Sequence, residues 1–441
     1  MDNNNLEIVE KIRQQFDRGP YPRIPLEDSP KEDYNFLYIH NIVTPFYLKN
    51  RKIFPGEKKV ILDAGCGSGY KALALAEANP GSKIVGVDIS EVSVNLAQKR
   101  LEYHGVENAE FHVLDIENLE SLGLEFDYIN ADDVLYLIPD LVAGLQSMKA
   151  VLKPEGIIRG NLHSALQRSN YFRAQNLFRM MGLMDENPGE LEIEIVRDTM
   201  IAIKDDVWLK KTTWTNEKSE DEEFFLANYL LQGDKGYTIP EMFEALHQAN
   251  LEFISMVNWR QWELLSLFKE PNNLPAFLSM SLPEISIQER LHLFELLHPI
   301  HRLLDFWCGH PTVEQNPVSV SDWSDSDWRR AKVHLHPQIK TNPVKEDLIQ
   351  SITYQRPFQI NRHLSSHTSD PLMLGSSIAT CLLPLWEGTQ TVSSLVERWL
   401  QVRSIDPVTL EAVSEKRAFE EVKDLLMTLE LFIYVLLQQS A

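Results

Sequence analysis

Three glycines at alternate positions, Gly65, Gly67 and Gly69, lie between two acidic residues, Asp63 and Asp88. Glycine tolerates positive φ and, lacking a side chain, lets a backbone approach a ligand closely. A helix that begins at such a loop presents free N–H groups, which favour an anionic group. A carboxylate that follows the next strand can accept both hydroxyls of a ribose. The spacing therefore predicts a site for a nucleoside that also carries an anionic group.

A strand, a helix and a second strand are predicted to position these residues. Val60, Ile61 and Leu62 form a short apolar run of the kind that is buried on both faces of a parallel sheet. Residues 72–78 have the pattern of a helix, and residues 84–87 that of the next strand. In an open α/β sheet, ligands bind at the carboxyl ends of the strands. The unit therefore predicts an α/β fold with its site at that edge.

The glycine spacing separates two cofactors that such a unit could bind. The dinucleotide fingerprint G-x-G-x-x-G requires a glycine where this chain has Tyr70. The observed D-x-G-x-G-x-G, which begins at Asp63, resembles motif I of class I S-adenosylmethionine-dependent methyltransferases. The resemblance covers residues 36–164 and implies a Rossmann-like, seven-stranded methyltransferase sheet that binds S-adenosyl-L-methionine. A plain glycine turn is the alternative for the loop alone.

The resemblance also implies which residues bind the cofactor. In the family, the acid at Asp88 holds the ribose, and the glycine loop packs against the aminocarboxypropyl group. The acid at Asp115 faces the adenine amino group, and the next apolar residue covers the ring. The implied cofactor-binding residues are Asp63, Ala64, Gly65, Gly67, Gly69, Asp88, Ile89, Asp115, Ile116, Asn130 and Ala131.

Catalysis needs groups that orient the acceptor and a group that takes its proton. Methyl transfer from a sulfonium is an in-line displacement, so the enzyme contributes mainly approach and orientation. Asp132, Asp133 and His163 follow the predicted fourth and fifth strands and are the candidate bases. Tyr136 is expected to shape the acceptor pocket. A helix cap for one aspartate and a backbone hydrogen bond for His163 are the structural alternatives.

The segment before the sheet resembles the one that precedes the methyltransferase domain in a poorly characterised bacterial group. That group has Q-Y-E-x-x-P-Y-P-R where residues 14–25 of this chain read QQFDRGPYPRIP. The prolines forbid a helix and favour extended structure. Tyr21, Tyr34 and Tyr38 are predicted to bind substrate from a lid over the cofactor cleft. The alternative is an aromatic brace that packs on the sheet edge.

The length of 441 residues predicts two or three domains, because it exceeds what one hydrophobic core supports. The middle and C-terminal regions faintly resemble bacterial protein-lysine methyltransferases, whose closing domain is a winged helix. An apolar helix is predicted over residues 291–306. The predicted divisions are an N-terminal helix and lid (1–50), the cofactor-binding core (51–165), a helical insertion (166–235), late strands with the apolar helix (236–310), a linker (311–343) and a mainly helical, winged-helix-like domain (344–441).

The formal net charge of −22 argues against nucleic acid as the acceptor, because binding phosphates requires a basic track. The acidic run over residues 217–223 is predicted to be a solvated loop. No apolar run approaches the ~18 residues that cross a bilayer, so no membrane contact is expected. The C-terminal domain is expected to contact protein or to form a homodimer.

Cysteine and histidine usage gives no sign of disulfides or of metal. Three widely spaced cysteines fit a reduced, cytoplasmic protein. His298, His301, Cys308 and His310 match no zinc spacing that closes a tetrahedral site, so no metal is expected.

The acceptor classes that remain are small molecules, peptides and proteins. Closed helical covers suit a small acceptor, because they exclude water and orient it. A large insertion and an accessory domain suit a polypeptide. We place a small-molecule or peptide acceptor first and protein lysine second. A fold kept as a binding or assembly module without catalysis is the third hypothesis, and the intact glycine loop argues against it.

Overall fold

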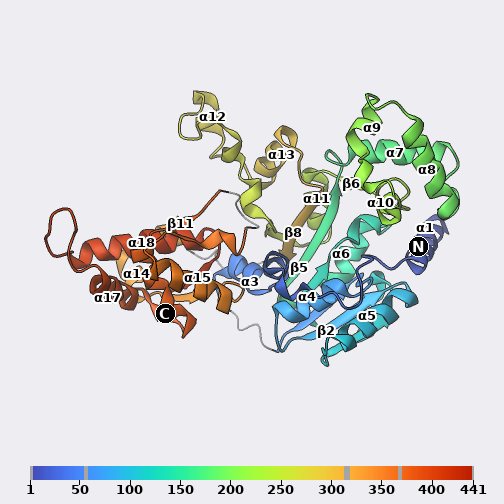
Figure 1. Cartoon of the computed structure of the whole chain (residues 1–441). Helices are drawn as coiled ribbons and strands as arrows, with labels where there is room; N and C mark the ends of the chain where they lie inside the picture. Colours follow the sequence, from blue (N-terminus) through green and yellow to red (C-terminus); the bar gives the residue numbers. More distant parts are fainter. Residues whose placement is uncertain (1–2, 54–57, 312–317, 366–369, 440–441) are drawn as a thin grey trace.

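The central feature of the computed structural model is an open sheet whose first five strands run parallel (Figure 1). The structure describes residues 3–53, 58–311, 318–365 and 370–439. The strand order is β3-β2-β1-β4-β5-β8-β7, a short β6 also pairs with β5, and β8 runs antiparallel to both of its neighbours. The strands are β1 (Val60–Ala64), β2 (Lys83–Asp88), β3 (Ala109–Val113), β4 (Phe126–Ala131), β5 (Leu152–Ser164), β6 (Gly236–Tyr237), β7 (Glu252–Met256) and β8 (Leu303–Gly309).

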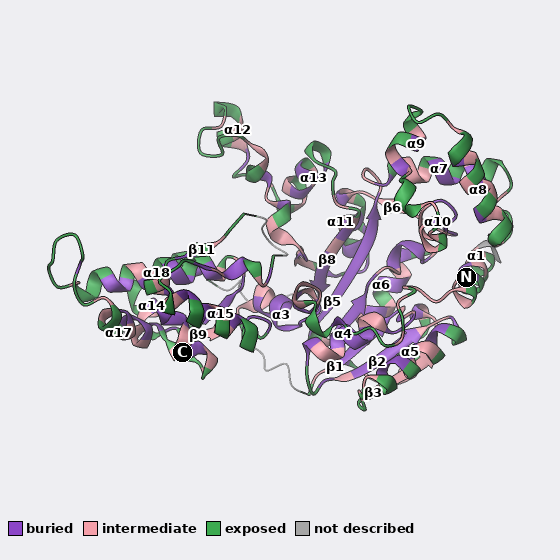
Figure 2. Ribbon diagram, in the orientation of Figure 1, coloured by how far each residue is buried: buried purple, intermediate pink, exposed green. Residues whose placement is uncertain are grey.

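Helices cover both faces of this sheet, as apolar runs in parallel strands predict. Ile61, Leu62, Val85 and Ile158 of the strands are fully buried, and Figure 2 shows the central strands buried. The seven-stranded methyltransferase sheet expected from the sequence is confirmed, with β6 as an addition. The helices that pack on the sheet are α3 (Val43–Asn50), α4 (Tyr70–Ala78), α5 (Glu91–Tyr103), α6 (Leu141–Ala150) and α11 (Ile239–Gln248).

The predicted helix over residues 291–306 is wrong in its second half. α13 (Ile287–Leu297) ends before Pro299, which has no N–H to donate, and the chain then forms β8. An apolar run that is buried on both faces of a sheet has no strand period, so periodicity cannot distinguish it from a helix. The Ser164 N–H at the end of β5 donates to the carbonyl oxygen of Arg302 at 2.9 Å. β8 thereby brings Arg302 to the carboxyl end of β5.

Residues between β5 and β6 form a helical unit with its own core. Phe178, Val196, Met200, Phe225 and Tyr229 are buried within it. Figure 1 shows its helices together at one end of the sheet, beside the N-terminus. The helices are α7 (Ser169–Met180), α8 (Glu190–Ala202), α9 (Trp208–Thr213) and α10 (Glu222–Asn228), whereas α12 (Ala276–Ser281) projects from the connection that follows β7.

The C-terminal unit begins earlier than the predicted boundary at residue 344. β9 (Lys332–Leu335) falls in the predicted linker, yet it is the central strand of a sheet of order β12-β9-β13. Trp323 and Trp328 are buried in the same core, while residues 312–317 of that linker lie outside the described residues. The other elements are α14 (Asp325–Arg330), α15 (Asn342–Thr353), β10 (Phe358–Gln359), β11 (Met373–Leu374), α16 (Ser376–Ala379), β12 (Gln390–Thr391), α17 (Val392–Val402), α18 (Glu415–Glu430) and β13 (Val435–Gln438).

α2 (Tyr34–Ile39) packs between the sheet and the C-terminal unit. The Tyr38 hydroxyl donates to the carbonyl oxygen of Phe432 at 2.9 Å, and the Tyr38 ring is buried in the C-terminal core. Tyr34 packs against the same core. The prediction that Tyr34 and Tyr38 bind substrate is therefore corrected. These two side chains brace the C-terminal unit and not the sheet edge, which was the alternative to a lid.

The N-terminal helix α1 (Asn3–Arg18) joins the sheet to the helical insertion. Gln15 Oε1 accepts the backbone N–H of Gln232 at 3.2 Å, and Lys11 Nζ donates to the carbonyl oxygen of Asp185 at 3.0 Å. α1 also packs against α5. Across the described residues, none of the helices combines the length and the apolar character that a membrane crossing needs.

A buried ion pair joins β5 to β8. Arg159 Nε and Nη2 donate to the two carboxylate oxygens of Asp305 at 3.0 and 2.7 Å, and the Arg159 side chain is only 3% exposed. Arg159 Nη1 also lies 3.4 Å from Asp132 Oδ2. A charged group is stable in a protein interior only when it is paired, so each of these groups depends on the others.

We expect Arg159→Met to lower the free energy of unfolding by about 3 to 5 kcal/mol, because it leaves the carboxylate of Asp305 without its cation and removes one of the two cations at Asp132. Urea unfolding followed by tryptophan fluorescence measures the change. Combining Arg159→Met with Asp305→Leu should recover part of the loss. Arg356→Met is the control, since Arg356 is 52% exposed in its ion pair with Asp347. Equal stability of Arg159→Met and the control would contradict a structural role for the buried pair.

Candidate active site

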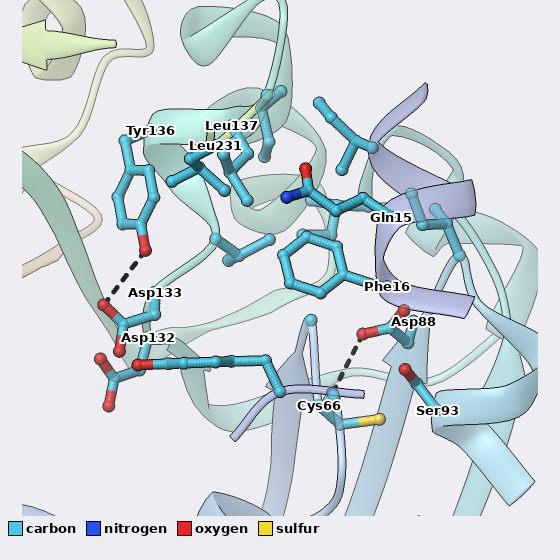
Figure 3. A pocket seen from close by; sticks show the side chains of 18 of the residues that line it. Gln15, Phe16, Cys66, Asp88, Ser93, Asp132, Asp133, Tyr136, Leu137 and Leu231 are labelled. Atoms are coloured by element: carbon cyan, nitrogen blue, oxygen red, sulfur yellow. Dashed lines mark hydrogen bonds between the residues drawn. The ribbon is translucent and has the colours of Figure 1, made fainter. Parts of the chain in front are cut away.

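A pocket lies at the carboxyl ends of β1, β2 and β4, where an α/β sheet binds its ligands (Figure 3). α1 lines one side of it through Val9, Ile12 and Phe16. Leu137, after β4, and Leu231, near the end of the insertion, line the facing side. Segments that are far apart in the sequence therefore enclose one site.

The glycine loop has the backbone conformation that its sequence predicts. Gly65, Gly67 and Gly69 have φ values of 77°, 49° and 81°, in the left-handed region that favours glycine. The Gly67 N–H donates to Asp88 Oδ2 at 3.0 Å, so the loop and the acid are joined directly. A Cβ atom at Gly67 would lie 2.2 Å from the carbonyl oxygen of Tyr21. Glycine is therefore required at position 67 by the approach of an N-terminal segment as well as by its φ.

That N-terminal segment, residues 19–26, is called the arm below, and hydrogen bonds fix it on the glycine loop. The Ser68 N–H donates to the carbonyl oxygen of Tyr21 at 2.9 Å, and the Ser68 hydroxyl donates to that of Pro22 at 2.8 Å. The buried guanidinium of Arg100 donates to two further carbonyl oxygens of the arm, each at 2.7 Å. The arm is therefore part of the pocket wall in this structure.

The residues that the family resemblance assigns to the cofactor fall into two groups. The first lines the pocket and consists of Gly65, Gly67, Asp88, Ile89, Asp115 and Ile116. The second is buried behind the pocket and consists of Asp63, Ala64, Gly69, Asn130 and Ala131. The second group supports the first, since it shapes the strands and the loop from which the lining residues project.

Asp88 and the residues around it fit a nucleoside. The two oxygens of Asp88 accept the N–H groups of Gly67 and Ser90 at 3.0 and 2.9 Å. A carboxylate has about four acceptor positions, so capacity remains for ribose hydroxyls. Figure 3 shows the Phe16 ring of α1 and the Asp88 carboxylate facing the same space. An aromatic ring and the apolar side chain of Ile116 provide surfaces for a purine.

Asp63 has a buried oxygen that makes no hydrogen bond. Its Oδ1 accepts the side-chain amide of Asn130 at 2.8 Å, whereas its Oδ2 has no partner. Burial raises the pKa of Asp63 to about 6. A buried acceptor without a donor is unfavourable, and an ammonium group at the glycine loop would supply a donor. The residues present therefore fit the aminocarboxypropyl ammonium of S-adenosylmethionine.

Asp133 lies at the other end of the pocket, where three side chains donate hydrogen bonds to its carboxylate. Its Oδ2 accepts from Lys71 Nζ at 2.8 Å, and its Oδ1 accepts from Arg302 Nη2 at 3.2 Å. Its Oδ1 also accepts from the Tyr136 hydroxyl at 3.3 Å (Figure 3). Burial favours the neutral acid, but Lys71 and Arg302 outweigh burial and lower the pKa of Asp133. Its φ of 61° is unusual outside glycine, and Asn161 Oδ1 stabilises it by accepting the Asp133 N–H at 2.9 Å. Asp133 is therefore an ionised hydrogen-bond acceptor with a fixed orientation.

Asp132 lies deeper, and its charge is neutralised inside the protein. Lys71 Nζ lies 3.1 Å and Arg159 Nη1 lies 3.4 Å from Asp132 Oδ2. Burial opposes ionisation, but Arg159 and Lys71 outweigh it and hold the pKa of Asp132 well below its usual value. α6, the next α-helix after β4, takes its cap from Asp140. The capping alternative for Asp132 or Asp133 is therefore corrected, since these two carboxylates bind cations.

His163 lies behind the pocket, stacked on Tyr136 with ring centroids 3.5 Å apart. Its Nδ1 lies 2.6 Å from Asp234 Oδ1, and its Nε2 lies 3.1 Å from Arg302 Nη1. Burial lowers the pKa of His163 to about 4, so the ring is neutral near pH 7. A neutral ring can donate from Nδ1 to Asp234 and accept at Nε2 from Arg302. Because both nitrogens are occupied, the prediction of a catalytic base at His163 is corrected.

Sequence reasoning misses several charged residues of the pocket, among them Lys71, Arg302 and Glu223. Lys71 lies in the first turn of α4, where a cation opposes the helix dipole, and that conflict is a usable signal. Arg302 falls in a stretch predicted as helix, and Glu223 falls in an acidic run predicted as a solvated loop. Neither has a local signal that would place it at a pocket.

The charges that meet at this end of the pocket balance, with four cations and four carboxylates. Burial and the nearby Asp133 carboxylate raise the pKa of Tyr21, so its hydroxyl stays protonated near pH 7. The cations are Arg23, Lys71, Arg159 and Arg302, and the carboxylates are Asp132, Asp133, Asp305 and Glu223.

Comparison with known proteins agrees with this site. Residues 55–223 match the sequence family described as "Methyltransferase domain". An uncharacterized protein of Synechococcus sp. is 27% identical over 327 residues, which cover 73% of this chain and 75% of that protein. The ubiquinone biosynthesis O-methyltransferase of Actinobacillus pleuropneumoniae is 33% identical over 104 residues, which cover 23% of this chain and 44% of that protein.

The solved structure of PKMT2 from Rickettsia typhi in complex with AdoHcy shares the fold along most of the chain. The similarity extends over 92% of this chain and 76% of that one, with a TM-score of 0.57 and 16% identity. The family match, the conformation of the glycine loop and the fit of Asp63 and Asp88 to the cofactor agree with one another. Residues 55–223 therefore form a methyltransferase domain, and the protein is an S-adenosylmethionine-dependent methyltransferase.

Proposed function

We propose that the chain methylates an amine of a polypeptide acceptor, of the kind that a lysine side chain presents. The observation that carries the proposal is Asp133, an ionised carboxylate that faces the pocket beside the phenols of Tyr21 and Tyr136. A carboxylate accepts N–H hydrogen bonds and so suits a nitrogen nucleophile.

The overall architecture supports a polypeptide rather than a small acceptor. PKMT2 from Rickettsia typhi, solved in complex with AdoHcy, shares its fold with 92% of this chain. Since so little of the chain is left unmatched, most of the insertion and of the C-terminal unit belongs to the shared fold. Elements of that size exceed what a small metabolite needs for binding. A polypeptide acceptor therefore ranks ahead of a small molecule.

The residues of the pocket orient the nucleophile. S-adenosylmethionine supplies an electrophilic methyl group on a sulfonium, and in-line displacement depends on approach and orientation. Asp133 accepts a hydrogen bond from the amine, while Lys71 and Arg302 keep its carboxylate in place. Because its lowered pKa makes Asp133 a weak base at neutral pH, the amine loses its proton to water before transfer. Tyr21 and Tyr136 confine the amine from the two sides.

The close approach of the arm to the glycine loop leaves no room for a side chain at position 67. Gly67→Ala should weaken binding of S-adenosylhomocysteine by more than about tenfold, or about 1.4 kcal/mol, because the added methyl meets a backbone carbonyl oxygen that cannot rotate away. Isothermal titration measures the affinity. Gly81→Ala is the matched control, since Gly81 has a φ of 82° and nothing within 4 Å of an added Cβ. Equal affinities for the two variants would contradict a specific role for position 67.

Another prediction concerns Asp63 and pH. Because burial raises the pKa of Asp63 to about 6, the carboxyl group is neutral below that pH and ionised above it. Binding of a ligand with an ammonium group should therefore strengthen as the pH rises from about 5 to 7.5. Asp63→Asn should remove this dependence, and a deaminated analogue of S-adenosylhomocysteine should not show it. A pH dependence that persists in Asp63→Asn would assign the titration to another group.

A further prediction tests the acceptor itself. The protein is incubated with methyl-labelled S-adenosylmethionine and a cell extract separated into protein and small-molecule fractions. We expect label in the protein fraction, stable to base, and recovered as Nε-methyllysine after acid hydrolysis. Asp133→Asn should reduce the transfer by about 10²-fold or more. Label confined to the small-molecule fraction, or released by base as from a methyl ester, would overturn the lysine-type acceptor.

A further inference from the structure

Arg302 makes a bridge between the pocket and a buried polar chain behind it. Its Nη2 donates to Asp133 Oδ1 at 3.2 Å, and its Nη1 donates to His163 Nε2 at 3.1 Å. The Arg302 side chain is 43% exposed, so the residue stands at the rim of the pocket. A guanidinium that is open to solvent on one side needs a second partner to keep a single orientation.

His163 provides that partner, and it is held by groups that are themselves buried. Asp234 fixes the His163 Nδ1, and the Asp234 side chain is 0% exposed. Arg168 Nη2 and Gln175 Nε2 both donate to Asp234 Oδ2, at 3.1 and 2.8 Å. With Nδ1 committed as a donor, His163 presents only an acceptor to Arg302. The polar chain therefore runs from α7 through Asp234 and His163 to the rim of the pocket.

We propose that Arg302 is a positioning residue for methyl transfer, aimed by His163 at Asp133 so that this carboxylate keeps one orientation toward the acceptor. The inference rests on the proposed role of Asp133 in holding the amine. Arg302 comes from the segment before β8, whereas Lys71 holds the other oxygen of Asp133 from α4. Two cations on opposite oxygens fix the plane of the carboxylate, which one cation could not do.

The titration of Asp133 reports this arrangement. The charged and titratable groups that face it are Lys71 from α4, Arg302 before β8, Asp132 beside it, Tyr136 and Tyr21. Lys71 and Arg302 favour the ionised carboxylate, and Asp132 and burial oppose it. Removing Arg302 therefore raises the pKa of Asp133, and the fraction ionised at low pH falls.

The experiment is a pH titration of the protein labelled with ¹³C at the aspartate carboxyl carbons, with the Asp133 signal assigned by its loss in Asp133→Asn. Arg302→Met should move the midpoint upward by about one pH unit or more. Arg302→Lys should give an intermediate midpoint, because it keeps the charge but cannot bridge two partners. His163→Phe, which keeps a ring against Tyr136 but removes the acceptor, should also give an intermediate midpoint. Arg173→Met is the control and should titrate like the parent protein, since Arg173 is exposed on α7.

An unchanged midpoint in Arg302→Met would overturn the positioning role, and an unchanged midpoint in His163→Phe would overturn the part assigned to His163. Thermal unfolding and S-adenosylhomocysteine binding show whether each variant folds. If Arg302→Met does not fold, the midpoint of Arg302→Lys serves as the test. The titration requires no acceptor. Absence of Nε-methyllysine with the parent protein would therefore overturn the proposed function alone, while a shifted midpoint would still support the role of Arg302.

Discussion

The carboxyl edge of the sheet is built around the buried charge of Asp132. Lys71 approaches this carboxylate from α4 and Arg159 approaches it from β5, while Arg159 also binds Asp305 of β8. None of these groups can lose its partner without leaving a charge in the protein interior. One helix and three strands are thereby fixed relative to one another. Lys71 also binds Asp133, so the acceptor end of the pocket is held in place by the same buried network.

The N-terminal arm is tied to the site as firmly as the core strands are. Its backbone carbonyl oxygens, not its side chains, make most of the hydrogen bonds that hold it, to Ser68 and Arg100. The glycine at position 67 leaves room for the carbonyl oxygen of Tyr21. Glycine therefore serves two purposes in this loop: it lets the cofactor approach on one side and the arm approach on the other. The Tyr21 side chain is free to face the pocket because the backbone carries the attachment.

The sequence predicts those parts of the structure whose residues lie close together along the chain. The glycine loop and Asp88 are separated by one strand and one helix, so spacing alone predicts their meeting. β8 is apolar on either side of Asp305, and nothing in its neighbourhood distinguishes a buried strand from a buried helix. Arg302 and Glu223 reach the pocket from distant segments, and their positions depend on that tertiary arrangement. Tyr38 is the reverse case, a residue that the sequence assigns to the site but that lies in the C-terminal core. Its sequence position near an expected lid does not distinguish a substrate contact from packing between two units.

The place of β8 in the sheet also decides which part of the chain can fold alone. The match to the methyltransferase family ends at residue 223, but β8 (Leu303–Gly309) lies between β5 and β7. Until β8 pairs with it, β5 is an open edge, and open edges associate with other chains. Until the same strand is in place, Arg159 of β5 also lacks its partner Asp305. In a growing chain, β5 therefore stays unprotected on one side until residue 309 has left the ribosome. Non-local pairing of this kind forms slowly, and an exposed strand edge is prone to aggregation while it lasts.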